Sequence, residues 1–272
     1  MKRLFFLALF ALSPLLGGAE KIVSLSPNLT EIIFQIGAGD QLVGRSSSCD
    51  YPPEVKSLPV VGRFGVPNLE PLLLTRPTLV VSETLRDDNV SKRLRELGIR
   101  YEEFPARDFD DYFITLKRLG KLLNQENNAD REIREKRKLL AQWEAENRAI
   151  PAKERPKVLV IIGVAPIITA GKNSFLTRFI ELAGGCNVAG EVEQSYFACS
   201  FEQIQLWQVE VILAPGLLPE QLQLLEKSPT WSNIPAVKNK KFFTDFNADL
   251  LYRLGSRSFD GIEKLRNIIM EK

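Results

Sequence analysis

The chain has 272 residues, enough for one large domain or for two lobes that each bury a hydrophobic core. It contains 36 Lys and Arg, 34 Asp and Glu, and no His. The absence of histidine excludes Ser-His-Asp and Cys-His catalysis and removes the commonest ligand of protein metal sites. We therefore expect a protein that is not an enzyme of these classes and that has no resident metal or cofactor.

Residues 1–19 have the layout of a cleaved secretory signal peptide. Met1-Lys2-Arg3 is basic, residues 4–16 are almost entirely apolar, and Gly17-Gly18-Ala19 supplies the small residues that a signal peptidase accepts. The competing interpretation is a membrane anchor, but the apolar run is shorter than the ~20 residues that span a bilayer. No Cys lies near the cleavage point for lipid attachment, so the sequence predicts a free periplasmic protein.

Cleavage after Ala19 removes Lys2 and Arg3 and no acidic residue, which leaves 34 basic residues against 34 acidic ones. Nucleic-acid binding needs a cationic surface that displaces phosphate counterions. The neutral mature chain therefore argues against nucleic acid as a partner.

Residues 20–109 alternate short apolar runs with helical segments. The predicted strands cover residues 21–26, 78–82 and 99–104, and the predicted helices cover residues 28–36, 71–76 and 89–97. Gly37 and Gly98 directly follow two of these helices, a common position for glycine. Strands that alternate with helices indicate an α/β lobe with a largely parallel sheet.

Residues 110–150 carry no strand signal. Phe113, Leu116 and Leu119 recur at helical spacing, and residues 130–148 are densely charged. This pattern predicts a solvated amphipathic helix that could link two lobes as a rigid strut.

Residues 151–272 return to the alternation of strands and helices. The predicted strands cover residues 158–162, 209–214 and 241–244, and the predicted helices cover residues 174–183, 201–208, 219–226 and 259–270. The sequence thus predicts a second α/β lobe.

The two halves resemble each other. Leu69-Glu70-Pro71-Leu72 runs into the strand Leu79-Val80-Val81, and at a constant offset of 132 Phe201-Glu202-Gln203-Ile204 runs into Val211-Ile212-Leu213. A second match, in the same order, relates the helix ending at Gly37 to the helix ending at Gly184. Two matches on either side of a helical strut favour duplicated lobes that face one another across a cleft.

The three cysteines, Cys49, Cys186 and Cys199, leave at least one thiol unpaired within a monomer. An oxidising compartment permits a Cys186–Cys199 disulfide, but the sequence does not assign it.

Several motifs resemble the helical-backbone (class III) solute-binding proteins that serve ABC importers of cobalamin, haem and iron–siderophores. The motifs span the mature chain and include Ser24-Leu25-Ser26-Pro27-Asn28-Leu29-Thr30-Glu31, Asp50-Tyr51-Pro52-Pro53, Asn68-Leu69-Glu70, Arg76-Pro77-Thr78-Leu79 and Leu182-Ala183-Gly184-Gly185. The vitamin B12 (cobalamin) binders are the most similar subgroup. One departure is Arg253-Leu254-Gly255-Ser256-Arg257, which replaces the family's Arg-Pro-Gly-Pro-Arg and is expected to affect a turn more than the function.

The resemblance implies two similar α/β lobes joined by a single long helix, with the ligand bound in the cleft between them. It implies a periplasmic monomer that delivers its ligand to an ABC permease dimer with ATPase subunits. Family members dock through one Glu on each lobe, and these positions match Glu70 and Glu202. The internal repeat supplies a physical reason, because equivalent carboxylates on two lobes match a two-fold cationic pair on a partner. The alternative is that each Glu only stabilises a helix N-terminus.

The resemblance also implies ligand-binding residues. In the first lobe these are Tyr51 and Phe64; in the second, Tyr196 and Phe197 in a loop before the docking helix, and Asp245-Phe246 after the last strand. Aromatic walls with a few polar groups suit a broad ligand such as a corrin. For Tyr51, Phe64, Phe197 and Phe246 the alternative is core packing.

The expected ligand is cobalamin or a related corrinoid, followed by an iron–siderophore and then haem. Haem is disfavoured because the chain has no His and because Phe64 lies where a haem-type Tyr is expected, although Tyr51 or Tyr196 could serve as axial ligand. Two other functions stay open: a sensor module that uses the same cleft, and a periplasmic acid/base hydrolase that uses two acids among Asp50, Glu83, Asp87 and Asp245.

Overall fold

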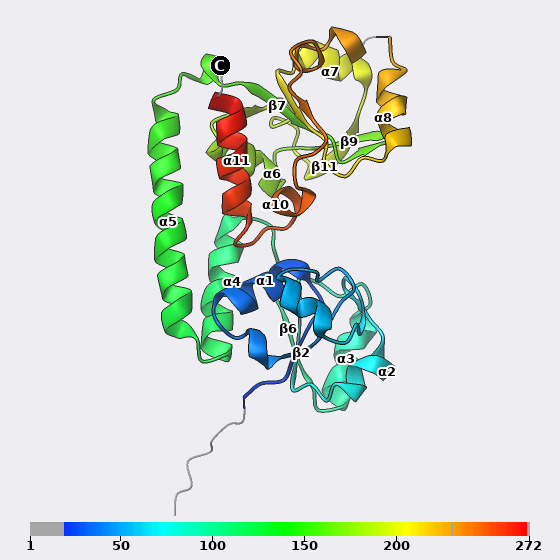
Figure 1. Ribbon diagram of the computed structural model, residues 1–272, viewed down its shortest axis with the longest axis vertical. Coiled ribbons are helices and arrows are strands. Elements are labelled where there is room, and N and C mark those ends of the chain that lie inside the picture. Colours follow the sequence, from blue (N-terminus) through cyan, green and yellow to red (C-terminus); the bar gives the residue numbers. More distant parts are fainter. Residues whose placement is uncertain (1–18, 230, 271–272) are drawn as a thin grey trace, which may run out of the picture.

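The computed structural model describes residues 19–229 and 231–270. It shows two α/β lobes stacked along the long axis of the molecule, with helices running alongside both (Figure 1). The predicted signal peptide lies outside the described residues except for Ala19. The α/β class and the two-lobed architecture predicted from the sequence are confirmed.

The first lobe is built on a four-stranded parallel sheet of order β2-β1-β5-β6. Its strands are β1 (Ile22–Ser24), β2 (Leu42–Arg45), β5 (Leu79–Ser82) and β6 (Arg100–Glu103), and its helices are α1 (Pro27–Gln35), α2 (Leu69–Leu74) and α3 (Asp88–Glu96). The two central strands, β1 and β5, are buried along their whole length, as continuous apolar runs in a parallel sheet predict. A small antiparallel hairpin of β3 (Gly62–Arg63) and β4 (Val66–Pro67) stands between β2 and α2 in the sequence.

The second lobe repeats this topology. Its strands are β7 (Lys157–Val160), β10 (Cys186–Asn187), β12 (Val211–Leu213) and β13 (Phe242–Phe243), in the parallel order β10-β7-β12-β13. Its helices are α6 (Phe175–Leu182), α7 (Phe201–Trp207), α8 (Pro219–Glu226), α9 (Pro235–Lys238), α10 (Ala248–Tyr252) and α11 (Ser258–Met270). If the strands of each sheet are counted in chain order, both sheets have the spatial order second, first, third, fourth. The repeat found in the sequence is therefore also a repeat of topology.

The second lobe also contains a whole sheet that was not predicted. An antiparallel sheet of order β11-β9-β8 is formed by β8 (Gly163–Val164), β9 (Ile167–Ala170) and β11 (Tyr196–Cys199). The expectation that Tyr196 and Phe197 lie in a loop is wrong, since both pair with β9. The strand depends on hydrogen bonds to residues far away in the sequence, which a local pattern does not reveal.

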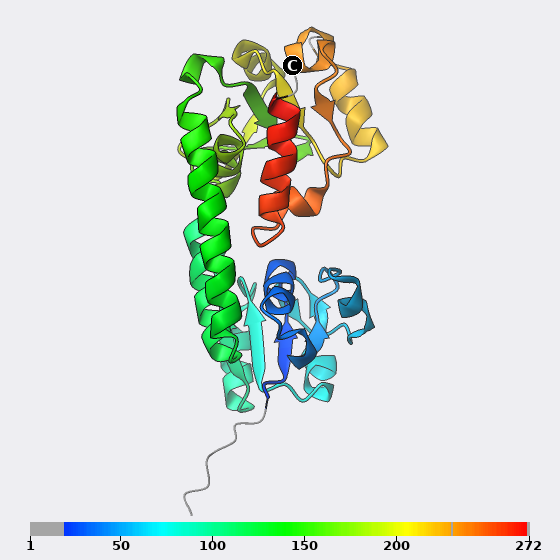
Figure 2. The same ribbon diagram turned by 60° about the vertical axis from the view of Figure 1, so that its left-hand side comes forward.

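The linking region contains no strand and is mostly helical, as predicted, but a turn at residues 123–125 divides it into two helices. It consists of α4 (Phe109–Leu122) and the 23-residue α5 (Glu126–Arg148), which fold back on one another around Asn124 with its positive φ of 56°. The long helix α5 runs past both lobes (Figures 1 and 2). No helix within residues 19–229 and 231–270 is both long enough and apolar enough to cross a membrane.

Helix α5 is fastened to each lobe by an asparagine. The side-chain amide of Asn128 donates to the carbonyl oxygen of Ile36 at the end of α1, at 3.0 Å. The amide of Asn147 donates to the carbonyl oxygens of Glu181 and Leu182 at the end of α6, at 2.8 and 3.0 Å. Each contact satisfies carbonyl groups that a helix end leaves without partners. The two lobes thus hold the strut at equivalent points.

The main hydrophobic core continues from one lobe to the other beneath the strut. Phe259 of α11, 2% exposed, packs with Phe109 and Tyr112 of α4 and Trp143 of α5, with ring centroids 5.6 to 6.1 Å apart. Because this aromatic cluster joins the linking helices to the second lobe, wide separation of the lobes would expose a large apolar surface.

Candidate functional site

A cavity of about 320 Å³ lies between the two lobes. The first lobe and the segment after it contribute Glu83, Ala106 and Arg107, and the second lobe contributes Asn173, Ser174, Phe175, Ser195, Tyr196, Tyr252 and Leu254. A second cavity of about 550 Å³ shares Arg107, Asn173, Ser174 and Phe175 with the first. Together they provide an interlobe space of the size usual for small-molecule sites.

The topology of the first lobe explains why Glu83 faces this space. In its sheet the strand order reverses between β1 and β5, and ligands of open α/β sheets bind outside the carboxyl ends of the strands at such a point. Glu83 directly follows β5, and its backbone N–H donates to the Ser26 hydroxyl just after β1 at 2.8 Å. The carboxyl group is therefore positioned by the sheet itself.

Burial in the cleft raises the pKa of Glu83 from an ordinary value of 4.5 to about 7. The side chain carries no compensating ion pair among those found in the described part of the chain, which leaves desolvation as the cause. The cleft thus holds a carboxyl group whose charge changes near neutral pH.

This raised pKa predicts a pH-dependent stability. The folded state binds the Glu83 proton more tightly than the unfolded state, so wild-type stability should fall as pH rises from about 4.5 to about 7. The slope from this one group is at most about 1.4 kcal/mol per pH unit. Urea unfolding at several pH values should show that Glu83→Gln removes this fall. An unchanged pH profile in the variant would contradict the assignment.

The aromatic residues of β11 divide between cleft and core. Tyr196 is 48% exposed and lines the interlobe cavity, whereas its neighbour Phe197 packs against the core of the second lobe. Successive side chains of a strand point to opposite faces, so the two cannot both line one cavity. For Phe197 the structure supports the alternative of core packing.

Phe64 lies at the tip of the β3–β4 hairpin, next to Gly65 with its positive φ of 63°. It lines a separate depression of about 260 Å³ together with Ser47, Ser48, Arg63, Val66 and Arg86. Two guanidinium groups and two hydroxyl groups around one aromatic ring suit an anionic or polar substituent of a ligand.

The remaining predicted ligand residues have three different environments. Tyr51 is 43% exposed and its ring lies under the guanidinium of Arg257, 3.9 Å from the centroid. Asp245 is exposed. Phe246 is 3% exposed and belongs to the main core, which corresponds to the core-packing alternative rather than to a ligand contact.

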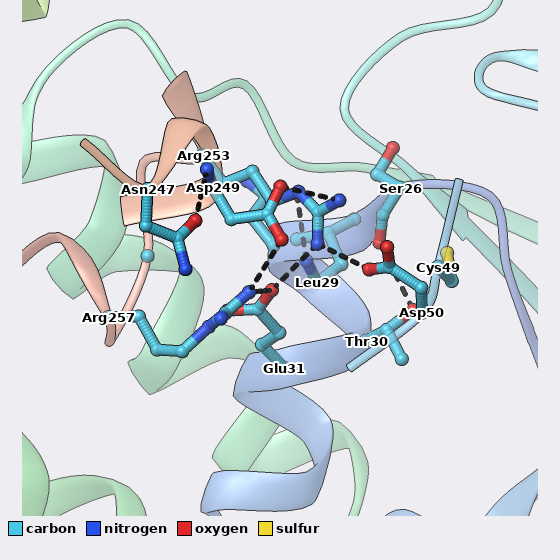
Figure 3. A network of polar contacts seen from close by, with 12 residues as sticks. Ser26, Leu29, Thr30, Glu31, Cys49, Asp50, Asn247, Asp249, Arg253 and Arg257 are labelled. Carbon is cyan, nitrogen blue, oxygen red and sulfur yellow. Dashed lines mark hydrogen bonds and ion pairs between the residues drawn. The ribbon is translucent and has the colours of Figure 1, made fainter. Parts of the chain in front are cut away.

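Five charged residues form ion pairs that join the two lobes, and we call them the interlobe ion-pair network (Figure 3). They are Glu31, Asp50, Asp249, Arg253 and Arg257. Glu31 of α1 accepts hydrogen bonds from Arg257 at 2.6 and 2.8 Å and from Arg253 at 3.3 Å. Arg253 also pairs with Asp50 at 2.7 Å and with Asp249 at 2.8 Å. Glu31 and Asp50 belong to the first lobe and the other three to the second.

The segment 253–257 contacts the first lobe through the two residues that it shares with the family's Arg-Pro-Gly-Pro-Arg. Both arginines, Arg253 and Arg257, bind Glu31. The hydrogen bond from Arg253 is the main reason why the pKa of Asp50 lies below its usual range.

The predicted docking residues lie at equivalent places. Glu70 and Glu202 are the second residues of α2 and α7, and both are exposed. The helix caps are Asn68, which accepts from the Glu70 N–H, and Ser200, which accepts from the Gln203 N–H. A hydrogen bond from the Ser200 side chain also holds the pKa of Glu202 below its usual range. Neither carboxylate forms an ion pair among those found in the described residues, so both are available to a partner.

Most residues that line the cleft were not placed there by sequence reasoning, among them Arg107, Asn173, Ser174, Phe175 and Tyr252. For Arg107 a weaker signal existed, since it comes four residues after β6, and the carboxyl ends of β5 and β6 lie at the same edge of the parallel sheet. Its guanidinium is held by Asp111, at 2.8 Å from Nε. The others come from loop and helix ends that approach the cleft only after the lobes have packed.

All three cysteines, which lie within the described residues, are free thiols; Cys49 and Cys199 are buried and Cys186 is exposed. The disulfide that the sequence left open is not formed in this structure.

The sequence profile of the family described as periplasmic binding protein matches residues 22–247. An uncharacterized ABC transporter substrate-binding lipoprotein, YvrC of Bacillus subtilis, is 28% identical over 255 residues, which cover 92% of this chain and 80% of the relative.

Two solved structures are similar over nearly the whole chain. The periplasmic vitamin B12 binding protein BtuF of Vibrio cholerae gives a TM-score of 0.75 at 25% identity and covers 92% of this chain and 96% of its own. A periplasmic haem-binding protein from Pseudomonas aeruginosa gives a TM-score of 0.80 at 25% identity and covers 92% of both chains.

Proposed function

We propose a function from one premise: this chain belongs to the periplasmic binding protein family. It is the substrate-binding component of an ABC importer, and it captures a small ligand in the interlobe cleft. It works in the periplasm after signal-peptide cleavage, as a monomer, and hands its ligand to a permease dimer that is driven by ATPase subunits. It binds reversibly and catalyses no reaction.

The ligand that we propose is cobalamin or a related corrinoid. The observation that carries this proposal is a cavity lined from both lobes by the rings of Tyr196, Tyr252 and Phe175 and by the polar groups of Glu83 and Asn173. A corrin has broad apolar faces and amide edges, which match ring faces and a few hydrogen-bonding groups. The similarity to a vitamin B12 binding protein over nearly the whole chain supports the same choice.

Haem, or an iron–siderophore, is the second candidate. The structural similarity to a haem-binding protein is somewhat higher than that to the vitamin B12 binding protein. Two phenol groups, Tyr196 and Tyr252, line the cavity, and a tyrosine oxygen can ligate haem iron. The guanidinium groups of Arg63 and Arg86 would suit the carboxylates of haem or the anionic groups of a siderophore.

Isothermal titration calorimetry with cyanocobalamin and with hemin tests the proposal on protein purified from a periplasmic extract. We expect a one-to-one cyanocobalamin complex with a Kd below roughly 1 μM, equivalent to about 8 kcal/mol. Binding of hemin alone would replace the corrinoid by haem and leave the transport role intact. Binding of neither would leave siderophores as the next ligand class to test.

Substitution of Tyr196 separates the two candidates further. If a corrin stacks on this ring, Tyr196→Ala should weaken binding by about 1 kcal/mol, and Tyr196→Phe should bind like the wild type because the ring is kept. If Tyr196 ligates haem iron, the phenylalanine variant should lose as much affinity as the alanine variant.

Phe64 lines the separate depression and is tested in the same way. Phe64→Ala should weaken ligand binding by about 1 kcal/mol, because an aromatic contact is lost. Calorimetry that shows no loss of affinity would remove Phe64 from the binding site.

A further inference from the structure

Helices α2 and α7 begin at equivalent positions of the two lobes, 132 residues apart. Their buried positions, Leu72 and Ile204, are both fully inaccessible and anchor the helices to the cores of their lobes. Shortly after each helix, the equivalent residues Arg76 and Gln208 both adopt the left-handed conformation, with φ values of 50° and 52°. The two lobes therefore present the same helix–turn unit in the same geometry.

Within this unit each lobe exposes one large apolar side chain. Leu74 and Leu206 occupy equivalent positions and are each 80% exposed, more than any other large hydrophobic residue of the described chain. Each lies two residues after the buried anchor, which places it on the solvent side of its helix. Packing in the core of its own lobe therefore does not account for a leucine at either position.

Each leucine also shares a helix face with a docking carboxylate. Leu74 follows Glu70 by four residues and Leu206 follows Glu202 by four residues, and side chains at this spacing are neighbours on a helix surface. Other positions of the unit differ between the lobes, such as Pro71 against Gln203. The Glu–Leu pair is therefore kept where the surrounding residues have changed.

We infer that Leu74 and Leu206 are apolar anchors of the docking surface. The partner that this surface fits is a permease dimer which offers, at two sites related by its two-fold axis, a basic side chain beside an apolar depression. Isolated exposed charges contribute mainly to the rate and orientation of encounter, whereas a buried apolar anchor contributes mainly to the lifetime of the complex. This inference rests on the proposed transport function and adds the residues that hold the complex together.

The test is biolayer interferometry with the permease–ATPase complex of the same organism, held in nanodiscs. Replacing Leu74 or Leu206 by alanine should weaken binding about tenfold, and the double variant about a hundredfold, because the two sites are independent. The loss should lie in the dissociation rate, with the salt dependence of association unchanged. Both side chains are exposed, so thermal unfolding should match the wild type.

Ile114→Ala is the matched control, since Ile114 is a 54% exposed apolar residue on α4, away from both units. It should bind like the wild type. A Leu74→Ala, Leu206→Ala double variant that binds within about twofold of the wild type would overturn the inference while leaving the transport function in place. Failure of the wild type itself to bind the complex would overturn both.

Discussion

Replacing Glu31 by alanine is expected to lower the free energy of unfolding by about 3–5 kcal/mol. The Glu31 side chain is 3% exposed and accepts hydrogen bonds from Arg253 and Arg257, which are only 17% and 14% exposed. The variant would leave two largely buried guanidinium groups without their central acceptor. Breaking one partner of a buried ion pair costs far more than the pair contributes by its own attraction, because the remaining charge stays desolvated. Urea unfolding at pH 7 measures the loss.

Two controls separate this effect from a general loss of charge. Asp50→Ala removes a carboxylate of the same network that is 47% exposed, and it should cost at most about 1 kcal/mol because solvent screens the pair. Glu31→Gln keeps the size of the side chain and an acceptor oxygen, and its cost should lie between the two. A Glu31→Ala variant that loses less than about 1 kcal/mol would show that the network does not stabilise the fold.

The network also bears on how the protein binds its ligand. Glu31 and Arg257 belong to different lobes, and two asparagines of α5 bind one lobe each at other places. With the lobes held together at two places and by a shared core, only small rotations are compatible with intact contacts. Closure over a ligand should therefore be limited to a few side chains and a slight change of angle.

The Glu70→Ala, Glu202→Ala double variant should keep its ligand affinity and lose at least about tenfold in ligand uptake by the reconstituted importer. Both carboxylates lie on outer helices, in neither of the interlobe cavities, so their removal leaves the cleft unchanged. The partner's cationic groups would lose their counter-charges at both sites at once. Transport in proteoliposomes and calorimetry on the same protein measure the two properties.

The control for this variant removes the same charge elsewhere. Glu54→Ala, Glu226→Ala replaces one exposed glutamate in each lobe, at positions that the internal repeat does not relate. Uptake with this control should equal that of the wild type. If uptake with the Glu70→Ala, Glu202→Ala variant also equals that of the wild type, the two glutamates do not dock the permease and only stabilise the N-termini of their helices.

Local patterns in the sequence predicted most of the scaffold. The continuous apolar runs gave the central strands, and the helices 28–36, 89–97 and 219–226 were placed within one or two residues of α1, α3 and α8. The short edge strands β2 and β10 and the sheet of β8, β9 and β11 were missed. These strands are two to four residues long and depend on pairing partners distant in the sequence, so that their own residues carry little signal.

The sequence by itself determined that this chain forms two related α/β lobes around a helical strut and carries one exposed glutamate at the same position of each. Those features depend on hydrophobic periodicity and on an internal repeat, both of which are properties of neighbouring residues. Only the tertiary structure decided which side chains meet between the lobes. Tyr196 faces the cleft and Phe197 the core because of the pleat of one strand, and Glu31 meets Arg257 because two lobes pack together. Such contacts join residues up to 226 positions apart, and no local pattern encodes their distance.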